Sequence, residues 1–368
     1  MKILHLTTHL NIGGITTYLY NLCLGLKRIG IDCSIACGSG ELIDDFKKAG
    51  IAIHRIPLRT KNILSPKIPL SLWSLQRKQA LEQWDIIHAH TRVAQALAHV
   101  LSRLSHIPYV TTMHGFYRHR IGRTLWPCLG DQTIAISSVV AHDILHHYPR
   151  HAARITTVLH GIQTDGLASD SPSDAEKEIF RKTIGLKPIP TLGVIARLSV
   201  EKGHLKLLEI LKYLNYSLNQ PAQLLIVGDG KQKELIIKKI KELDLDDRVY
   251  LLPSQKSPRM ALSLIDVYVA YHEQPEAFGL AILEAMRAAK PIVVSNRGDG
   301  VTDFFENQKD GFMIESASVR QMAEKISLLL NSRQLREKMG KHGAGKIRER
   351  FSFQRMAKQT ADIYEKIL

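Results

Sequence analysis

Two glutamates eight positions apart, Glu276 and Glu284, enclose the nearly apolar sequence Ala-Phe-Gly-Leu-Ala-Ile-Leu. Residues 278–289 form a pattern that predicts a helix apolar nearly all round, which is typical of a buried helix. A buried carboxylate needs a hydrogen-bond donor or a cation, because leaving it alone costs free energy or raises its pKa. Ligand hydroxyls would meet that need at Glu284. An ion pair with Arg287, or exposure at a helix edge, would meet it equally well.

The segment before this helix places Glu276 in a loop that joins a strand to a helix. Residues 266–270 predict a short buried strand, and residues 272–277, which contain a proline, predict the loop. In a parallel sheet such loops lie at the carboxyl ends of the strands, where ligands bind. The amides of Phe278, Gly279 and Leu280 would face an anion at the helix start. The simplest ligand that uses all these groups is a phosphate that carries sugar hydroxyls.

Two cations, Arg197 and Lys202, lie in a second predicted loop of this kind, beside Gly203. Arginine offers a planar fork and lysine a compact charge, and together they suit a diphosphate. The alternative is that both are solvated loop charges.

Two further candidates follow predicted strands in the first half of the chain. Gly13 and Gly14 close the loop after the first strand, where a phosphate could approach the backbone, although paired glycines are often only a turn. They do not form the Gly-x-Gly-x-x-Gly dinucleotide motif. His114, followed by a glycine, lies just past another strand, which favours a place in a ligand site.

The length of 368 residues predicts two domains, and the composition is that of a globular protein, with 45% hydrophobic and 23% charged residues. No apolar run reaches the ~18 residues that would cross a bilayer. The N-terminus turns polar too soon for a signal peptide, so we expect a cytoplasmic protein. The four cysteines show no Cys-x-x-Cys spacing and are expected to be reduced.

Strands and helices alternate in both halves, which predicts an α/β protein with two doubly wound parallel sheets. The expected strands are residues 2–7, 32–37, 85–89, 109–112, 133–136 and 155–159, then 191–196, 223–227, 249–252, 266–270 and 291–294. The composition shifts to Asp, Ser and Pro near residues 162–187, as in a domain connection. We therefore expect domains at residues 1–165 and 166–350.

The net charge of +15 is uneven. Residues 1–160 hold 18 Lys and Arg against 8 Asp and Glu, with 14 of the 17 histidines. This half could meet nucleic acid, an anionic membrane surface, or an acidic glycan or phospholipid acceptor, or its charge could simply solubilise it. Arg118, Arg120 and Arg123 cluster after His114, and residues 55–78 mix cations with leucines and a tryptophan, which suits a membrane face.

No metal site is expected. Asp244 and Asp246 form an Asp-x-Asp pair, but they end a charged helix and predict a turn. No histidines and cysteines show the spacing of a ligand set.

Five motifs of this chain carry a family resemblance: Gly13-Gly14, His114-Gly115, Arg197 with Lys202, Gly228-Asp-Gly230, and Glu276 through Glu284. Together they resemble the motifs of the retaining GT-B glycosyltransferases of family four, the group-1 glycosyltransferases. The resemblance covers essentially the whole chain. It implies two Rossmann-like domains that face a cleft, an acceptor-binding N-terminal domain and a C-terminal domain that binds a nucleotide-diphosphate sugar. It also implies that the last helix, in residues 351–368, returns to the first domain.

The resemblance also implies the roles of single residues. Glu284 would hold the ribose hydroxyls and Glu276 those of the donor sugar. Arg197 and Lys202 would neutralise the diphosphate with help from Gly14 and the amides near Phe278, and His114 would lie beside the transferred sugar. The chain departs from the family pattern at residues 160–163, His-Gly-Ile-Gln, and at residues 297–300, Arg-Gly-Asp-Gly.

The expected reaction is transfer of a sugar from a UDP- or GDP-sugar to an acceptor hydroxyl with retention, in the synthesis of lipopolysaccharide or another cell-surface glycan or glycolipid. No cofactor is expected, and the protein could lie on the inner face of the cell membrane. An epimerase or a phosphorylase of GT-B shape would bind similar ligands. A nucleic-acid-binding module is a weaker alternative, because aromatic residues make up only 6% and no stacking or groove-reading motif is present.

Overall fold

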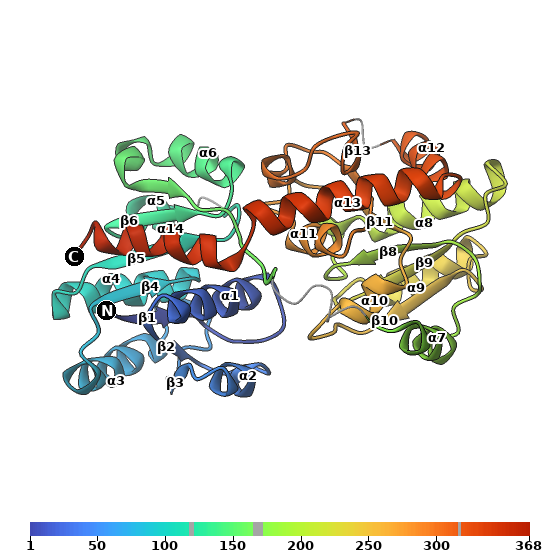
Figure 1. Cartoon of the computed structure of the whole chain (residues 1–368). Helices are drawn as coiled ribbons and strands as arrows, with labels where there is room; N and C mark the ends of the chain where they lie inside the picture. The colour runs from blue at the N-terminus through green and yellow to red at the C-terminus, as the bar shows by residue number, and fades with distance from the viewer. Residues whose placement is uncertain (118–120, 165–171, 316–317) are drawn as a thin grey trace. The chain divides into compact units, whose positions relative to one another are not determined.

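The computed structural model describes residues 1–117, 121–164, 172–315 and 318–368 (Figure 1). The chain divides into two compact units. Unit 1 comprises residues 1–163 and 351–368, and unit 2 comprises residues 164–350. Arg118 and Arg120, expected on an acceptor or membrane face, lie outside the described residues.

Unit 1 contains a seven-stranded parallel sheet in the order β3-β2-β1-β4-β5-β6-β7. Its strands are β1 (Lys2–Leu6), β2 (Asp32–Cys37), β3 (Ala52–Arg55), β4 (Ile86–Ala89), β5 (Tyr109–Met113), β6 (Gln132–Ala135) and β7 (Ile155–Thr157). Its helices are α1 (Gly14–Arg28), α2 (Ile43–Lys48), α3 (Lys67–Glu82), α4 (Arg92–Ser105), α5 (Ile121–Leu125), α6 (Ser138–His147) and α14 (Phe353–Glu365).

Unit 2 contains a six-stranded parallel sheet in the order β10-β9-β8-β11-β12-β13. Its strands are β8 (Thr191–Ile195), β9 (Gln223–Val227), β10 (Val249–Leu252), β11 (Val267–Ala270), β12 (Ile292–Ser295) and β13 (Gly311–Ile314). Its helices are α7 (Asp174–Thr183), α8 (His204–Lys212), α9 (Lys233–Glu242), α10 (Arg259–Ser263), α11 (Leu280–Arg287), α12 (Val319–Leu330) and α13 (Arg333–Arg350).

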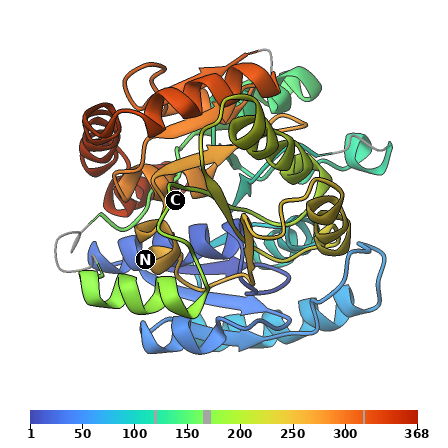
Figure 2. The ribbon, with the colours of Figure 1, turned by 90° about the vertical axis from the view of Figure 1, so that its right-hand side faces the viewer.

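Helices cover both faces of each sheet, as the two ribbon views show (Figures 1 and 2). In unit 1, α1 and α2 share one apolar cluster with β2, while α3 and α4 share another with β4. In unit 2, α8, α9 and α12 bury apolar side chains on one face. These are the doubly wound parallel sheets that the sequence predicts, so the fold class is confirmed.

The C-terminal helix α14 packs along α1 within unit 1 (Figure 1). The contact is close at Gly25, where an added Cβ would lie 2.5 Å from the Cβ of Ala357. A bridge between Ile162 and Ser352 ties the segment before α14 to the segment after β7. Unit 1 is therefore completed by the last residues of the chain.

Two strands and one helix boundary differ from the predictions. The edge strands β3 and β13 were not predicted, because each has only four residues and so forms too short a pattern to recognise in the sequence. Helix α11 begins at Leu280 because Gly279, its N-cap, has φ 92° and lies outside the helical region. No helix in the described parts of the chain combines the length and apolarity that a membrane span requires.

Candidate donor and acceptor sites

In unit 2, the loops after β8 and β11 are joined by an ion pair between Lys202 and Glu276. Both side chains are largely buried, with exposed fractions of 24% and 19%. The backbone supports this pair, because the amide of Glu273 donates to the Glu201 carbonyl at 3.1 Å. The structure thus brings together two residues that the sequence placed separately at the ends of two strands.

Gly203 allows the two loops to approach. It has φ 53°, and an added Cβ would lie 2.7 Å from the carbonyl oxygen of Tyr271. A side chain at this position would collide with the backbone in an already unfavourable conformation. Glycine is therefore required where the Lys202 loop crosses the end of β11.

Asp299, which lies after β12, fixes Glu276 from the other side. It is fully buried, and its two carboxylate oxygens accept from His272 Nδ1 at 2.5 Å and from the Glu276 amide at 2.7 Å. The Gly300 amide donates back to the Glu276 carbonyl at 2.8 Å. His272 Nε2 faces the Glu276 carboxylate at 3.8 Å. Asp299 and His272 thus position Glu276.

This network keeps Glu276 ionised. Burial alone would raise the pKa of its carboxyl, but the charges of Lys202 and His272 and a hydrogen bond from Lys202 hold that pKa below the usual value. His272 and Asp299 were not predicted as site residues. The only indication in the sequence was the Arg-Gly-Asp-Gly departure at residues 297–300.

Helix α11 begins four residues after Glu276. Its N-cap Gly279 offers no side-chain cap, so the first amides, from Leu280 on, are available to an anion. The Phe278 ring is buried against Phe304, with ring centroids 5.0 Å apart. Of the predicted group, Leu280 therefore carries a backbone amide at the open helix start, Gly279 forms the turn before it, and the side chain of Phe278 anchors that turn.

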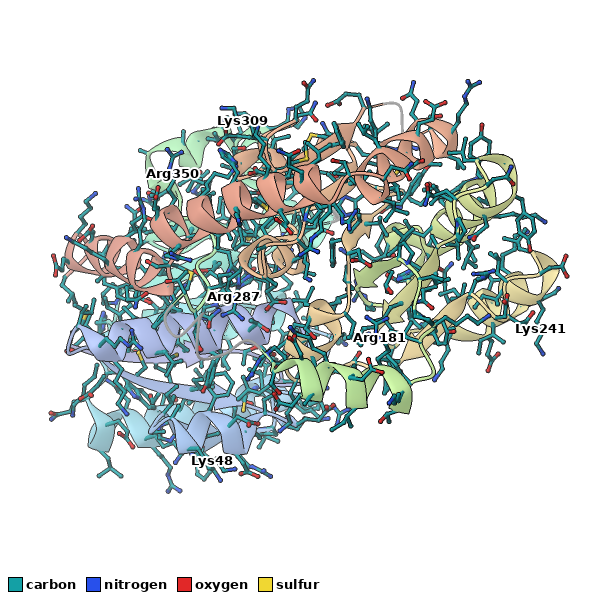
Figure 3. All side chains as sticks on the ribbon, turned by 45° about the vertical axis from the view of Figure 1, so that its right-hand side comes forward. Lys48, Arg181, Lys241, Arg287, Lys309 and Arg350 are labelled. Carbon is teal, nitrogen blue, oxygen red and sulfur yellow. The ribbon has the colours of Figure 1, made fainter. Side chains whose placement is uncertain are left out.

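Glu284 lies one turn further along α11 and is half-buried. Burial raises the pKa of its carboxyl to about 7, against the opposing charge of Arg287, which is labelled on this helix in Figure 3. Because burial disfavours the charged form of this carboxyl, a ligand that supplies hydrogen-bond donors would stabilise its ionised state.

Arg197 differs from Lys202 in being exposed. Its guanidinium forms an ion pair with Glu201 at 2.9 Å and keeps 71% of its side-chain surface in solvent. Such a surface pair is worth little and can be exchanged for another anion.

In unit 1, His114 follows β5 and continues a row of histidines. Its Nε2 lies 3.3 Å from His90 Nδ1, and His90 Nε2 lies 3.0 Å from His5 Nδ1. Burial, with a smaller contribution from His160, lowers the pKa of His114 to about 3. The imidazole is therefore neutral at physiological pH and can donate or accept a hydrogen bond but carries no charge.

Gly13 and Gly14 form the start of α1 in the same unit. Both are exposed, and among the described residues no atom outside the adjoining backbone lies within 4 Å of a Cβ added at either position. No side chain caps this helix. The start of α1 is thus open, as an approach by an anion requires.

Comparison with known proteins identifies the family. A model described as glycosyl transferases group 1 matches residues 176–346, and one described as glycosyltransferase family 4 matches residues 12–165. The chain belongs to the group 1 glycosyltransferases.

Several relatives of this glycosyltransferase resemble it over nearly their whole length. It is 24% identical to the UDP-Gal:alpha-D-GlcNAc-diphosphoundecaprenol alpha-1,3-galactosyltransferase of Escherichia coli, over 97% of this chain and 98% of that one. The crystal structure of a glycosyltransferase from Rickettsia africae superposes with a TM-score of 0.86, at 20% identity, over 100% and 98% of the two chains. Anabaena Alr3699/HepE in complex with UDP-glucose gives 0.85, at 20% identity, over 100% of both chains. The GT-B fold is thereby confirmed.

Arg123 of the glycosyltransferase is not on a surface, contrary to the expectation of an acceptor or membrane face. It is only 7% exposed, and its guanidinium lies over the Tyr117 ring at 4.1 Å. It also donates to Gln95 Oε1 at 3.4 Å. Its place in the short helix α5 turns it inward, so it stabilises unit 1 instead of offering charge to a partner.

The sequence shows no histidines and cysteines with the spacing of a ligand set, but the fold brings several of them together. Among the described residues, ligand atoms of His5, Cys23 and Cys33 lie within 4.8 Å of one another, as do those of His5, His88 and His90. These residues come from different strands and one helix, so no spacing along the sequence could reveal them.

Proposed function

We propose that this glycosyltransferase moves a sugar from a UDP- or GDP-sugar to a hydroxyl of a glycan or lipid-linked acceptor, with retention at the anomeric carbon. The main support is the Lys202–Glu276 pair, held by Asp299 and His272 beside the open start of α11. The structural relative from Anabaena binds UDP-glucose. A cation and an open helix start suit the diphosphate of a nucleotide sugar, and two carboxylates suit its sugar and ribose hydroxyls.

In this proposal each group has a separate task. Lys202, with Arg197, places positive charge on the leaving diphosphate in the role that a metal ion has in other transferases, and such electrostatic stabilisation is usually the largest catalytic contribution. Glu276 accepts from hydroxyls of the donor sugar and Glu284 from those of the ribose. The two glutamates thus bind and position the donor and do not form an acid–base pair.

In this proposal unit 1 binds the acceptor and also contributes groups to catalysis and to donor binding. His114, a neutral imidazole, contributes a hydrogen bond near the transferred sugar, and the open start of α1 at Gly13 and Gly14 contributes backbone amides toward phosphate.

The donor can be found by thermal shift with UDP-, GDP- and ADP-sugars, because a bound ligand at 100 times its dissociation constant stabilises by ~2.7 kcal/mol. With the donor known, Lys202→Ala should lower kcat by ~100-fold or more. Lys206→Ala is the matched control, since Lys206 also forms an ion pair, with Glu209 at 2.8 Å. Equal activity of the two variants would remove Lys202 from the reaction. Anomeric coupling constants of the product test retention.

The acceptor is proposed to be presented at an anionic membrane. Helix α3 buries Ser71 and Leu75 but exposes a second stripe of mostly apolar side chains: Leu70, Trp73, Arg77 and Leu81. Their spacing of three and four residues places them on one helical face. Arg77 lies over the Trp73 ring at 4.1 Å, and Lys61 and Lys67 are exposed nearby. Apolar and cationic side chains on one exposed face suit the surface of an anionic bilayer.

Sedimentation with phosphatidylglycerol vesicles tests this membrane face. The wild-type protein should bind at low salt, and the double variant Leu70→Ser/Trp73→Ser should bind much less. The control is Leu235→Ser/Ile237→Ser on α9, which removes two exposed apolar side chains elsewhere. Absence of wild-type binding at low salt, or equal loss in both variants, would reject the membrane face while leaving the transferase assignment intact.

A further inference from the structure

His5, Cys23 and Cys33 meet beneath the first helix of unit 1. Residues Ile3 and His5 of β1 pair with Cys33 and Ile35 of β2, so His5 and Cys33 project from the same face of the sheet. Helix α1 packs on this face and brings Cys23 to it. One ligand atom from each of the three residues lies within 4.8 Å of the other two.

One nitrogen of this group lacks a nitrogen or oxygen partner among the described residues. His5 is fully buried, and its Nδ1 is engaged with His90 Nε2 at 3.0 Å. Its Nε2 has no nitrogen or oxygen partner among the described residues, and the Cys33 thiol interacts with this imidazole. A buried polar atom without such a partner is costly, so its retention requires an explanation such as an unseen ion. Because Nδ1 is engaged, Nε2 is the nitrogen that His5 can offer beside the two thiols.

The neighbouring group of three histidines is a weaker candidate. His88 already uses both ring nitrogens, with Tyr364 Oη at 2.6 Å and Thr112 Oγ1 at 2.7 Å. A metal at His5, His88 and His90 would have to break one of these bonds. At His5, Cys23 and Cys33 a metal would replace only weak thiol hydrogen bonds, such as the one that Cys33 Sγ donates to the Ile31 carbonyl at 3.8 Å.

We propose that His5 Nε2, Cys23 Sγ and Cys33 Sγ bind a thiophilic divalent ion of the zinc class in unit 1. Two thiolates and an imidazole are a soft ligand set that suits zinc. With Zn–S of about 2.3 Å and Zn–N of about 2.0 Å, tetrahedral ligands lie about 3.5–3.8 Å apart. From separations of up to 4.8 Å, the three side chains need to close by about 1.3 Å at most. Binding releases the thiol protons to solvent, and the ion keeps its oxidation state.

The surroundings match those of a metal-bound histidine. Such a histidine usually donates its other ring N–H to a fixed acceptor, which sets its orientation. Nδ1 of His5 has His90 Nε2 in that position, and His90 Nδ1 in turn faces His114 Nε2. An ion on His5 Nε2 would fix the His5 proton on Nδ1, so His90 would accept at Nε2 and donate from Nδ1 toward His114. The site would thus set the tautomer of a residue proposed for the acceptor side.

The test uses full-length protein without a polyhistidine tag, reduced and stripped with a chelator. Titration with Zn²⁺ against a chromophoric competitor should give one tight ion per chain. Co²⁺ in its place should give the near-ultraviolet thiolate-to-cobalt band, which ions on surface histidines do not produce. His5→Gln and Cys33→Ser should each weaken binding by at least ~10-fold and reduce that band.

Two features make the outcome decisive. Cys37→Ser is the matched control, because Cys37 is a buried thiol on the same strand and outside the three-residue group, and it should bind like the wild type. Cys33 is only partly buried, so its variant should fold even if the His5 variant does not. Absence of a tight ion or of the cobalt band in the wild type, an unchanged Cys33→Ser variant, or a Cys23–Cys33 disulfide in freshly isolated protein would each overturn the proposal.

Discussion

The raised pKa of Glu284 predicts that donor affinity depends on pH. A carboxylate that accepts from ribose hydroxyls must be ionised, so donor binding favours the ionised form. With a pKa of about 7 in the free protein, the carboxyl is ionised in about 90% of molecules at pH 8 and about 10% at pH 6. Because only the ionised fraction is competent, the apparent Kd should rise about 10-fold between these values.

Calorimetry with the donor sugar in matched buffers measures this change. A nucleotide sugar is the right probe, because its diphosphate is substituted at both ends and does not titrate in this range. Binding at pH 7 should also release about half a proton per site, seen as a dependence of the enthalpy on the buffer. Glu284→Gln should bind more weakly with a nearly flat pH profile. A flat wild-type profile, or the same slope in both proteins, would refute the role of Glu284.

The same group affects stability in the opposite direction. A carboxyl whose pKa is raised on folding, here from 4.5 to about 7, stabilises the folded state fully below pH 4.5 and loses that contribution as pH rises through 7. At about 1.4 kcal/mol per pKa unit, the loss is at most about 3 kcal/mol. The difference in unfolding free energy between wild type and Glu284→Gln should follow this curve without ligand, and saturating donor should offset it at neutral pH.

Three further predictions concern single residues of unit 2. Asp299→Asn should cost about 3 kcal/mol in unfolding free energy, because a buried charged acceptor of two hydrogen bonds is lost, and it should lower kcat/KM with little change in secondary structure; unchanged kinetics would show that the Asp299 carboxylate does not position Glu276. Gly203→Ala should destabilise by more than 1 kcal/mol in urea denaturation, since its Cβ would press on Tyr271. Gly345→Ala, in open space on α13, should instead stabilise by about 0.5–1 kcal/mol in the same assay.

The features that the sequence predicts well are those determined within one segment, such as a buried strand and the loop that follows it. Central strands are nearly continuous apolar runs in unit 2, and those of unit 1 are short buried segments in which apolar residues alternate with a few histidines and threonines, so the strands and the fold class followed from the pattern. Lys202 and Glu276 each follow such a strand, and parallel topology brings the ends of strands to one edge. That was enough to select both residues, but their pairing and its partners required the structure.

Residues whose role depends on contacts with distant parts of the sequence were either not predicted or given the wrong environment. Asp299 lies 23 residues from Glu276 and 27 from His272 in sequence, and its importance comes from complete burial rather than from any pattern. Arg123 was misjudged for the opposite reason. Its place in a cluster of cations predicted an exposed side chain, but in the structure the side chain points inward and lies over the Tyr117 ring. Charge counts do not reveal the direction of a side chain.

The Lys202–Glu276 pair also bears on how the donor enters. A partly buried ion pair gives little net stability, because desolvation offsets most of its attraction. A diphosphate carries more charge than one carboxylate, so Lys202 can turn to it at small cost. Glu276 is then released to accept from sugar hydroxyls, while Asp299 holds its backbone and His272 remains beside its carboxylate. In the proposed reaction, when Lys202 leaves Glu276 to bind the diphosphate, the Glu276 carboxylate therefore becomes free to position the sugar.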